Sequence, residues 1–439
     1  MKAKKFIAVI CMILAMFMLS SCSRADLIRT VDSLLTPPLY YSEYEGLVTA
    51  FNNSVGENVI LCNPANGDNL SAITVSDIDG DKSEEAIIFY RYATDSLNVR
   101  FSVFDSDNGE WKKAGDYIGF GDEVYSLELL DMDNNDSSEI IIHWGFSGTP
   151  VTNVITVYKI SQSGRLSQIV MDSCEFSKVA DMDDDGKNEI LYISSSNNGR
   201  VTVKKAHLLR LVDGNLTEVS CIPVDSNVIS YVSFKECKYE GSPLKIYLDA
   251  AKSNSSMITE LLYWDKDQQT LVDPFYDEET STSNRTLRYE QITCADINGD
   301  GHPEVPVQYV PDNEDISGLH ITSWVSFESE YPVTVAKTFV NVADGYMVDF
   351  SKLNVTPVVS MQKSGRITDY VVYDESVGSD NILLTVSTIP AEDYSEGGDY
   401  GVYILKNNDV AVCAITSDYG EIHGITESSL RDIITKLPS

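Results

Sequence analysis

The sequence predicts a mainly β protein, a β-propeller of five or more repeated units followed by a small α+β domain. Short segments rich in Tyr, Val and Ile recur along the chain, as is typical of strands. A nine-residue acidic loop recurs with a period near 50 residues, which is typical of propeller-like arrays. After about residue 330 the period is lost, and several strand-like segments precede a helix-like one. At 439 residues the chain is too long for one compact core, so we expect more than one domain.

Residues 1–22 have the composition of a targeting segment. Three lysines precede an apolar run over residues 6–19. The run ends in Leu19-Ser20-Ser21-Cys22, which resembles the lipobox of bacterial lipoproteins. That resemblance implies cleavage before Cys22 and lipidation of its thiol. The protein would then be anchored to the bacterial cell membrane on its extracytoplasmic face. An ordinary secretory signal or an uncleaved anchor is the alternative.

Residues 23–56 are expected to form a tether and a short helix. A proline pair at 37 and 38 stops any helix and spaces the folded part from the bilayer. Between residues 40 and 55, apolar side chains fall at helical intervals. We expect this helix to cap the first repeat unit.

Four acidic loops carry the pattern of a hard-cation site. Each has oxygen-bearing side chains at positions 1, 3 and 5 and a Glu at position 9. Alternate residues of a tight loop aim their oxygens at one point, as Ca²⁺ requires. An EF-hand would need a Glu at position 12, but no loop has one there. The position-7 residue would contribute its backbone carbonyl. The predicted calcium positions (1, 3, 5, 7 and 9 of each loop) are Asp77, Asp79, Asp81, Ser83 and Glu85; Asp131, Asp133, Asn135, Ser137 and Glu139; Asp181, Asp183, Asp185, Lys187 and Glu189; and Asp296, Asn298, Asp300, His302 and Glu304.

The spacing of the loops predicts one further unit. They begin at residues 77, 131, 181 and 296, so the last interval is about twice the others. Residues 232–248 fill the gap, with a strand–turn–strand pattern but no carboxylate ladder. Five units would occupy residues 57–328, and a six- or seven-bladed ring is the alternative. Pro306 indicates an edge strand after the fourth loop. Strands in the first units are expected at 87–92, 98–104, 124–130, 139–144 and 154–160.

The repeated loops, each between a short strand and an apolar one, resemble FG-GAP/VCBS repeats. With the lipobox, the chain is similar to VCBS-repeat lipoproteins of Gram-positive, clostridia-like bacteria. The resemblance implies a β-propeller with calcium in the loops and covers roughly residues 60–325. Lys82, Asn135 and Asp136 depart from the family pattern. These departures favour calcium in the third and fourth loops over the first and second.

Residues 329–439 are expected to form the small α+β domain. A helix is expected over 428–436, because its apolar side chains lie on one face. Strands are expected at 337–350, 356–362, 367–374, 381–389, 400–406 and 409–416.

The composition excludes some functions and leaves two open. A formal charge of −35 excludes a nucleic-acid partner. The five histidines form no H-E-x-x-H motif, and no G-x-S-x-G motif occurs. We expect no enzyme, but a membrane-tethered calcium-binding propeller that binds a protein or polysaccharide ligand or acts as a scaffold. The alternative is a carbohydrate-active or other hydrolytic enzyme using the central face of the propeller, which would need inward-facing acids or aromatic side chains from several units.

The cysteines beyond Cys22 show no metal-site spacing. We expect small buried hydrophobic residues rather than disulfides, with Cys221 and Cys237 as the alternative pair. The six are Cys62, Cys174, Cys221, Cys237, Cys294 and Cys413.

Overall fold

The computed structural model describes residues 44–437, except for 57, 96, 147–148, 198, 200, 213, 309–318, 329–331, 375, 377–380 and 396–397. The targeting segment with Cys22 and most of the expected tether therefore lie outside the described residues. Among those that are described, no helix has the length and apolar character needed to cross a membrane.

The described chain is mainly β and folds into six antiparallel sheets, numbered here in chain order. The mainly β prediction is confirmed.

Sheet 1 contains β1 (Val59–Leu61), β2 (Ile73–Ser76), β3 (Glu85–Tyr92), β4 (Arg100–Asp107) and β5 (Glu110–Ile118). Sheet 2 contains β6 (Glu123–Leu130), β7 (Glu139–Phe146), β8 (Thr149–Ile160) and β9 (Leu166–Cys174). Sheet 3 contains β10 (Phe176–Ala180), β11 (Glu189–Asn197), β12 (Thr202–Val212) and β13 (Asn215–Val224). Sheet 4 contains β14 (Ser230–Cys237), β15 (Lys245–Ser253), β16 (Ser256–Asp265) and β17 (Thr270–Val272).

Sheet 5 contains β18 (Val305–Gln308), β19 (Ile321–Ser326), β20 (Val333–Asn341), β21 (Tyr346–Asp349) and β27 (Ile434–Lys436). Sheet 6 contains β22 (Pro357–Ser364), β23 (Ile367–Asp374), β24 (Ile382–Pro390), β25 (Val402–Asn407) and β26 (Val410–Thr416). The helices are α3 (Glu45–Val55), α4 (Asp418–Ile422), α5 (Leu430–Ile433) and the short 3₁₀ helix η2 (Asn284–Thr286).

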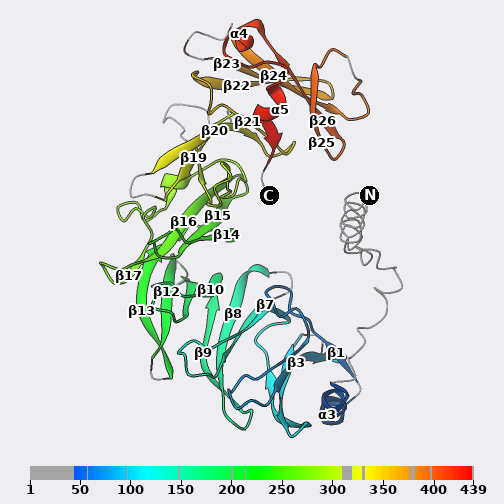
Figure 1. Ribbon diagram of the computed structural model, residues 1–439, viewed down its shortest axis with the longest axis vertical. Coiled ribbons are helices and arrows are strands. Elements are labelled where there is room, and N and C mark those ends of the chain that lie inside the picture. Colours follow the sequence, from blue (N-terminus) through cyan, green and yellow to red (C-terminus); the bar gives the residue numbers. More distant parts are fainter. Residues whose placement is uncertain are drawn as a thin grey trace, which may run out of the picture.

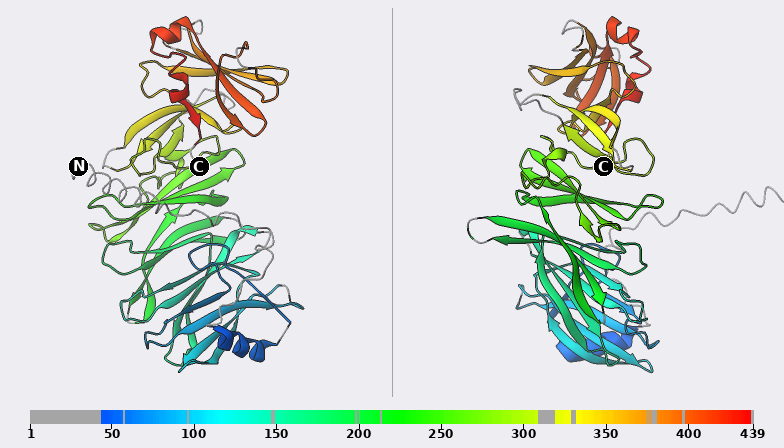
Figure 2. Two further views of the ribbon diagram at one scale, coloured as in Figure 1. Left: turned by 45° about the vertical axis from the view of Figure 1, so that its right-hand side comes forward. Right: turned by 90° about the vertical axis from the view of Figure 1, so that its left-hand side faces the viewer.

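Sheets 1 to 5 follow one another along an arc, with α3 at one end and sheet 6 beyond the other (Figures 1 and 2). In sheets 3 and 4 the first strands, β10 and β14, lie on the concave side of the arc, and the last strands, β13 and β17, lie on the convex side (Figure 1). The unit expected at 232–248 is present as β14 and β15 of sheet 4, paired from Ser230 with Ala251 to Cys237 with Lys245.

Neighbouring sheets pack face to face, and this explains the continuous apolar runs in their second strands. Ile140 and Ile142 of β7 pack in the cluster shared with sheet 1, while Ile141 between them packs in the cluster shared with sheet 3. Successive side chains of a strand point to opposite faces, so a strand covered on both faces needs apolar residues at every position. Helix α3 covers the outer face of sheet 1, where buried Leu47 and Phe51 contact Tyr90 and its neighbours. The expected helix is thus confirmed from residue 45 onward.

Two predictions near the end of the chain are wrong. The single strand expected over 337–350 is a hairpin of β20 and β21, because the chain turns at Gly345 with a φ of 71°. The helix expected over 428–436 ends after one turn, and residues 434–436 form β27 instead. Ile434 pairs with Val348 and is buried in the core between sheets 5 and 6, which outweighs the helical spacing of the apolar residues.

Sheet 5 has two further features that bear on the predictions. Its strands β18 and β19 precede residue 329 and β20 and β21 follow it, so strand pairing runs across the expected domain boundary. Pro306 lies in β18, the strand that ends the strand order of this sheet. That position needs no ladder hydrogen bond from the proline nitrogen.

Candidate sites in the acidic loops and on the concave face

The four acidic loops occupy equivalent turns, each leading directly into the strand at its position-9 glutamate. The first three connect β2 to β3, β6 to β7 and β10 to β11. The fourth lies between Ala295 and Glu304, which form an isolated bridge just before β18. The sequence repeat is therefore a structural repeat.

Each loop is folded by its position-1 carboxylate. Asp181 accepts hydrogen bonds from the backbone N–H groups of Asp184, Asp185 and Gly186, at 2.7, 3.1 and 3.1 Å. Asp296 accepts equivalent bonds in the fourth loop. The position-5 oxygens accept from the N–H of position 7 in all four loops.

The residue at position 6 has a positive φ in every loop, between 67° and 87°. This includes Lys82 and Asp136, which replace the glycine of the other two loops. The departures from the family pattern therefore leave the turn intact.

The position-9 glutamates are buried anchors. Glu85, Glu139, Glu189 and Glu304 are each at most 2% exposed. One oxygen of each accepts the N–H of position 2, at 2.8 to 3.0 Å. Burial raises the pKa of Glu85 to about 7 and that of Glu189 to about 6. A nearby cation would stabilise the ionised form of such a buried glutamate.

Three loops bring carboxylates together as a hard cation would need. The oxygens of positions 1, 3 and 9 lie within 4.8 Å of one another in the first, second and third loops. In the fourth loop Asn298 replaces the acid at position 3, and its amide donates to Glu304 and Asp300. Glu85 Oε1 in the first loop and Asp133 Oδ1 in the second are buried without a hydrogen-bond partner, and such oxygens suit the coordination of a hard cation. His302, at position 7, packs its ring against Tyr239 at 4.3 Å.

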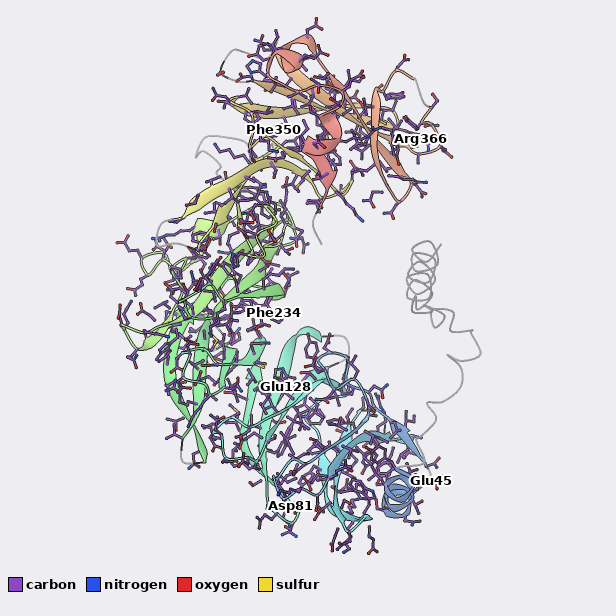
Figure 3. All side chains as sticks on the ribbon, in the orientation of Figure 1. Glu45, Asp81, Glu128, Phe234, Phe350 and Arg366 are labelled. Carbon is purple, nitrogen blue, oxygen red and sulfur yellow. The ribbon has the colours of Figure 1, made fainter. Side chains whose placement is uncertain are left out.

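A second candidate site is a groove on the concave face, with a volume of about 620 Å³. Its walls come from β6, β7, β10 and β14, with residues 66 and 67 at one edge. Glu128 and Phe234, which line it from different sheets, lie along the concave side in Figure 3. Tyr125 and Phe234 are 42% and 43% exposed, so their rings are available to a ligand.

The groove holds carboxyl groups in two different environments. Burial raises the pKa of Glu128, while the nearby Lys178 opposes the rise. Glu175 instead accepts a hydrogen bond from the ammonium of Lys204, which is 3% exposed. The first environment is desolvated, and the second places a buried ammonium beside the carboxyl group.

His143 also lines the groove, but burial lowers its pKa to about 4 and keeps the ring neutral. Its Nδ1 lies 3.1 Å from Ser177 Oγ. The sequence reasoning missed this groove and found no cluster of acids outside the metal loops, because the lining residues come from separate segments.

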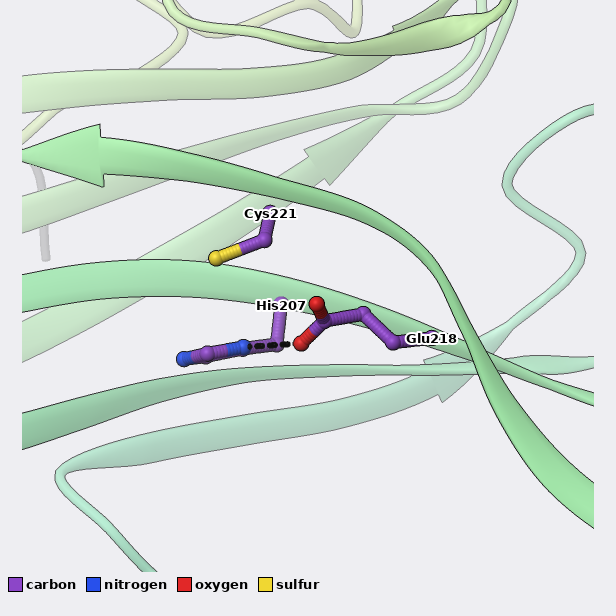
Figure 4. A group of neighbouring side chains, drawn as sticks. All are labelled: His207, Glu218 and Cys221. Carbon is purple, nitrogen blue, oxygen red and sulfur yellow. Dashed lines mark hydrogen bonds and ion pairs between the residues drawn. The ribbon is translucent and has the colours of Figure 1, made fainter.

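His207, Glu218 and Cys221 lie together in sheet 3 and are residue types that bind metal ions (Figure 4). Both ring nitrogens of His207, however, already have polar partners. Nδ1 of His207 is 2.6 Å from a Glu218 oxygen, and its Nε2 is 2.8 Å from Ser194 Oγ. Its ring also stacks on Tyr192. We assign this group to the packing of the sheet surface.

The six cysteines of the described chain are free thiols, and five of them are buried, as expected for small apolar residues. Cys221, partly exposed, is the sixth. Tyr90 and Trp144 are fully buried and belong to the core, so their rings are not available to a sugar ligand.

No protein-family model matches the sequence, and no curated protein does. Similar solved structures include an exo-β-1,3-galactanase from Phanerochaete chrysosporium, at 13% identity and a TM-score of 0.27, covering 82% of this chain and 93% of that one. A GH43 β-1,3-galactosidase has 11% identity and a TM-score of 0.28, covering 77% and 75%. A fructofuranosidase from Schwanniomyces occidentalis has 12% identity and a TM-score of 0.26, covering 80% and 85%.

These three proteins are named as sugar-cleaving enzymes, and that finding contradicts the prediction that the chain is not an enzyme. We withdraw that prediction. At such TM-scores the likeness assigns neither a substrate nor a catalytic residue to this chain. The site must be argued from its own geometry.

Proposed function

We propose that the protein is a carbohydrate-active enzyme that binds a glycan in the concave groove and cleaves a glycosidic bond there. The observation that carries the proposal is the pairing of exposed aromatic rings with two differently held carboxyl groups in one groove.

The aromatic side chains suit a sugar ligand. Tyr125 lies on β6 and Phe234 on β14, so two different sheets present rings to the groove. Phe176 of β10 contacts Phe234 edge-on, with ring centroids 5.4 Å apart, and supports its orientation. Flat apolar rings with polar neighbours bind the apolar faces of sugars and hydrogen-bond their hydroxyls.

The carboxyl groups suit glycoside hydrolysis, which needs one acid and one carboxylate. Glu128, whose pKa is raised by burial, would donate a proton to the glycosidic oxygen as the bond to the anomeric carbon breaks. Glu175, paired with Lys204, would act on the opposite side, either as the base that activates a water molecule for attack on the anomeric carbon or as the nucleophile that attacks it directly. Lys204 also donates to the carbonyl of Val228 at 2.7 Å, so its ammonium is fixed in place.

The wider architecture forms part of the same proposal. We propose that sheets 1 to 5 are blades of a FG-GAP/VCBS-type β-propeller, since four of them repeat the same antiparallel strand order and pack face to face. Where Ca²⁺ binds in an acidic loop, it would stabilise the hairpin by neutralising carboxylates that repel one another. The lipobox would tether the enzyme through Cys22 outside the membrane, where a polysaccharide is accessible.

The test compares hydrolysis with binding. The purified chain is incubated with a panel of oligosaccharides, and released reducing sugar and binding are measured separately. Glu128→Gln should lower kcat by about 10²–10⁴-fold while binding persists. Phe234→Ala should weaken binding. The matched control for Glu128→Gln is Glu110→Gln, the same substitution at an exposed position on strand β5. If the parent chain cleaves no glycan in the panel, or if Glu128→Gln cleaves as fast as the parent, the hydrolytic assignment is wrong.

A further inference from the structure

We infer that the residue opposite the position-9 glutamate, on the next strand along the chain, decides which of the first three acidic loops bind a divalent cation. By this rule the first loop is a cation site, and Arg210 takes the place of the cation in the third loop. The inference concerns the loops alone and does not depend on the groove.

The register of the sheets places a different side chain opposite each position-9 glutamate. In sheet 1, Glu85 pairs with Asp105. In sheet 2, Ile140 pairs with Tyr158, so the preceding Glu139 faces Lys159. In sheet 3 the same step places Arg210 beside Glu189. The position opposite the glutamate is therefore an aspartate in sheet 1, a lysine in sheet 2 and an arginine in sheet 3.

In the third loop the guanidinium of Arg210 occupies the ligand positions. Its Nε lies 2.9 Å from Glu189 Oε1, and its Nη2 donates to Asp183 Oδ2. The same two carboxylates are positions 3 and 9 of the predicted calcium site. Because the arginine supplies both the positive charge and the hydrogen bonds, a divalent cation would have to displace a bidentate ion pair.

The rim of the third loop carries more positive charge. Asp184 lies 2.6 Å from Lys238 Nζ and 3.4 Å from Lys266 Nζ, both from sheet 4. Lys238 lies in the turn between β14 and β15, and Lys266 lies in the turn between β16 and β17. Three cationic side chains thus surround the loop whose sequence is closest to the family pattern.

The second loop is intermediate. Lys159 Nζ lies 3.9 Å from Asp133 Oδ2 and 3.8 Å from Glu139 Oε1, at the outer limit of an ion pair. Asp133 Oδ1 stays buried without a partner. A single flexible ammonium at this distance is a weaker competitor for a metal ion than the guanidinium.

Around the first loop, acidic side chains converge without a basic side chain, among the described residues, in an ion pair with them. Asp77, Asp79 and Glu85 converge within 4.8 Å, and Asp105 adds a further carboxylate opposite Glu85. Within the described part of the chain, no Lys or Arg forms an ion pair with these four residues. Glu85 is 0% exposed, its Oε2 is used by two backbone N–H groups, and its Oε1 has no partner. A buried carboxylate oxygen aimed into a cluster of acids with no counter-charge is the setting that a hard divalent cation neutralises.

The experiment measures Ca²⁺ bound per chain. The full chain is stripped with chelator and titrated with Ca²⁺ by calorimetry, with equilibrium dialysis as an independent count. Asp105→Lys should lose one bound Ca²⁺ and the part of the Ca²⁺-dependent rise in Tm that this ion supplies. Asp77→Asn, which keeps the loop's size, should lower the affinity of the same ion. Arg210→Gln should gain one bound Ca²⁺ relative to the parent.

Each result bears on the inference. If Asp105→Lys and Asp77→Asn bind as many Ca²⁺ ions as the parent, with equal affinity, the first loop is not a site and the inference fails. If Arg210→Gln folds but gains no ion, the arginine does not occupy the place of a cation, and that half of the inference is wrong. If Arg210→Gln does not fold, Arg210→Lys replaces it, because a lysine retains the charge but loses the bidentate contact. That variant should gain a weaker site, and no gain would count against the inference.

Discussion

Arg288 and Asp249 form a fully buried ion pair that links sheet 4 to the segment leading into sheet 5. Both side chains are 0% exposed, and Arg288 Nη2 lies 2.7 Å from Asp249 Oδ1. Arg288 also donates to Thr259 Oγ1 at 3.1 Å and to backbone carbonyls of its own segment. Asp249 accepts further hydrogen bonds from Ser233 Oγ and from the N–H of Cys294. Its charge is therefore well compensated only while the guanidinium is present.

We predict that Arg288→Met lowers the free energy of unfolding by about 3–5 kcal/mol, because the variant leaves Asp249 buried with an uncompensated charge. Methionine fills similar volume, so the loss is electrostatic and not a cavity effect. The double variant Arg288→Met/Asp249→Leu should recover most of that loss, since removing both members of a buried pair is often nearly neutral. The assay is urea denaturation of the parent, both single variants and the double variant.

The control is Arg366→Met, which removes an arginine whose side chain is 66% exposed in its pair with Glu392. Solvent screens that pair, so no measurable change is expected. The reasoning is refuted if Arg288→Met changes stability no more than this control. It is also refuted if the double variant is as unstable as the sum of the two single variants.

Three further predictions concern stability. Burial raises the pKa of Glu290 from 4.5 to about 7, so the folded chain holds a proton that the unfolded chain has released. The stability contributed below pH 4.5 is therefore lost as the pH rises to 7, on the order of 3 kcal/mol, and Glu290→Gln should flatten that fall in urea titrations. An unchanged slope would contradict this. Phe51→Ala should cost about 3–5 kcal/mol and speed hydrogen exchange in α3, because the ring is 5% exposed and lies 5.3 Å from that of Tyr90. Exchange at the parent rate would show that α3 does not depend on this contact. Gly119→Ala should destabilise by about 1–3 kcal/mol and shift Trp fluorescence, because the added Cβ would lie 2.3 Å from the Trp144 ring; an unaltered spectrum and midpoint would exclude the clash.

The elements that the sequence predicts well are those whose signal is local. The strand over Ile367–Asp374 has its expected bounds, because a segment rich in β-branched and aromatic residues lies there between Gly- and Ser-containing turns. The sheet at 232–248 follows from the period alone. The acidic loops follow from side chains in one short segment, and their backbone folding needs no distant partner.

The features that the sequence does not predict depend on pairing between distant segments. The groove joins residues of β6, β10 and β14, which become neighbours only once the sheets form an arc. The role of Arg210 requires the register of sheet 3, and its position is more than twenty residues from the loop it enters. The final helix fails because Ile434 finds a strand partner far back in the chain. In each case contacts between distant segments outweigh the local propensity of the sequence.

The pairing of β27 with β21 has a consequence for synthesis and assembly. During translation, sheet 5 can form its first four strands while the edge of β21 stays open until residues 434–436 emerge. An open edge is a template for another chain, so this interval is the time of greatest exposure to misassembly. A chain cut before residue 434 would keep the edge permanently. Proteolytic trimming there should therefore promote self-association, which light scattering of the trimmed protein would detect.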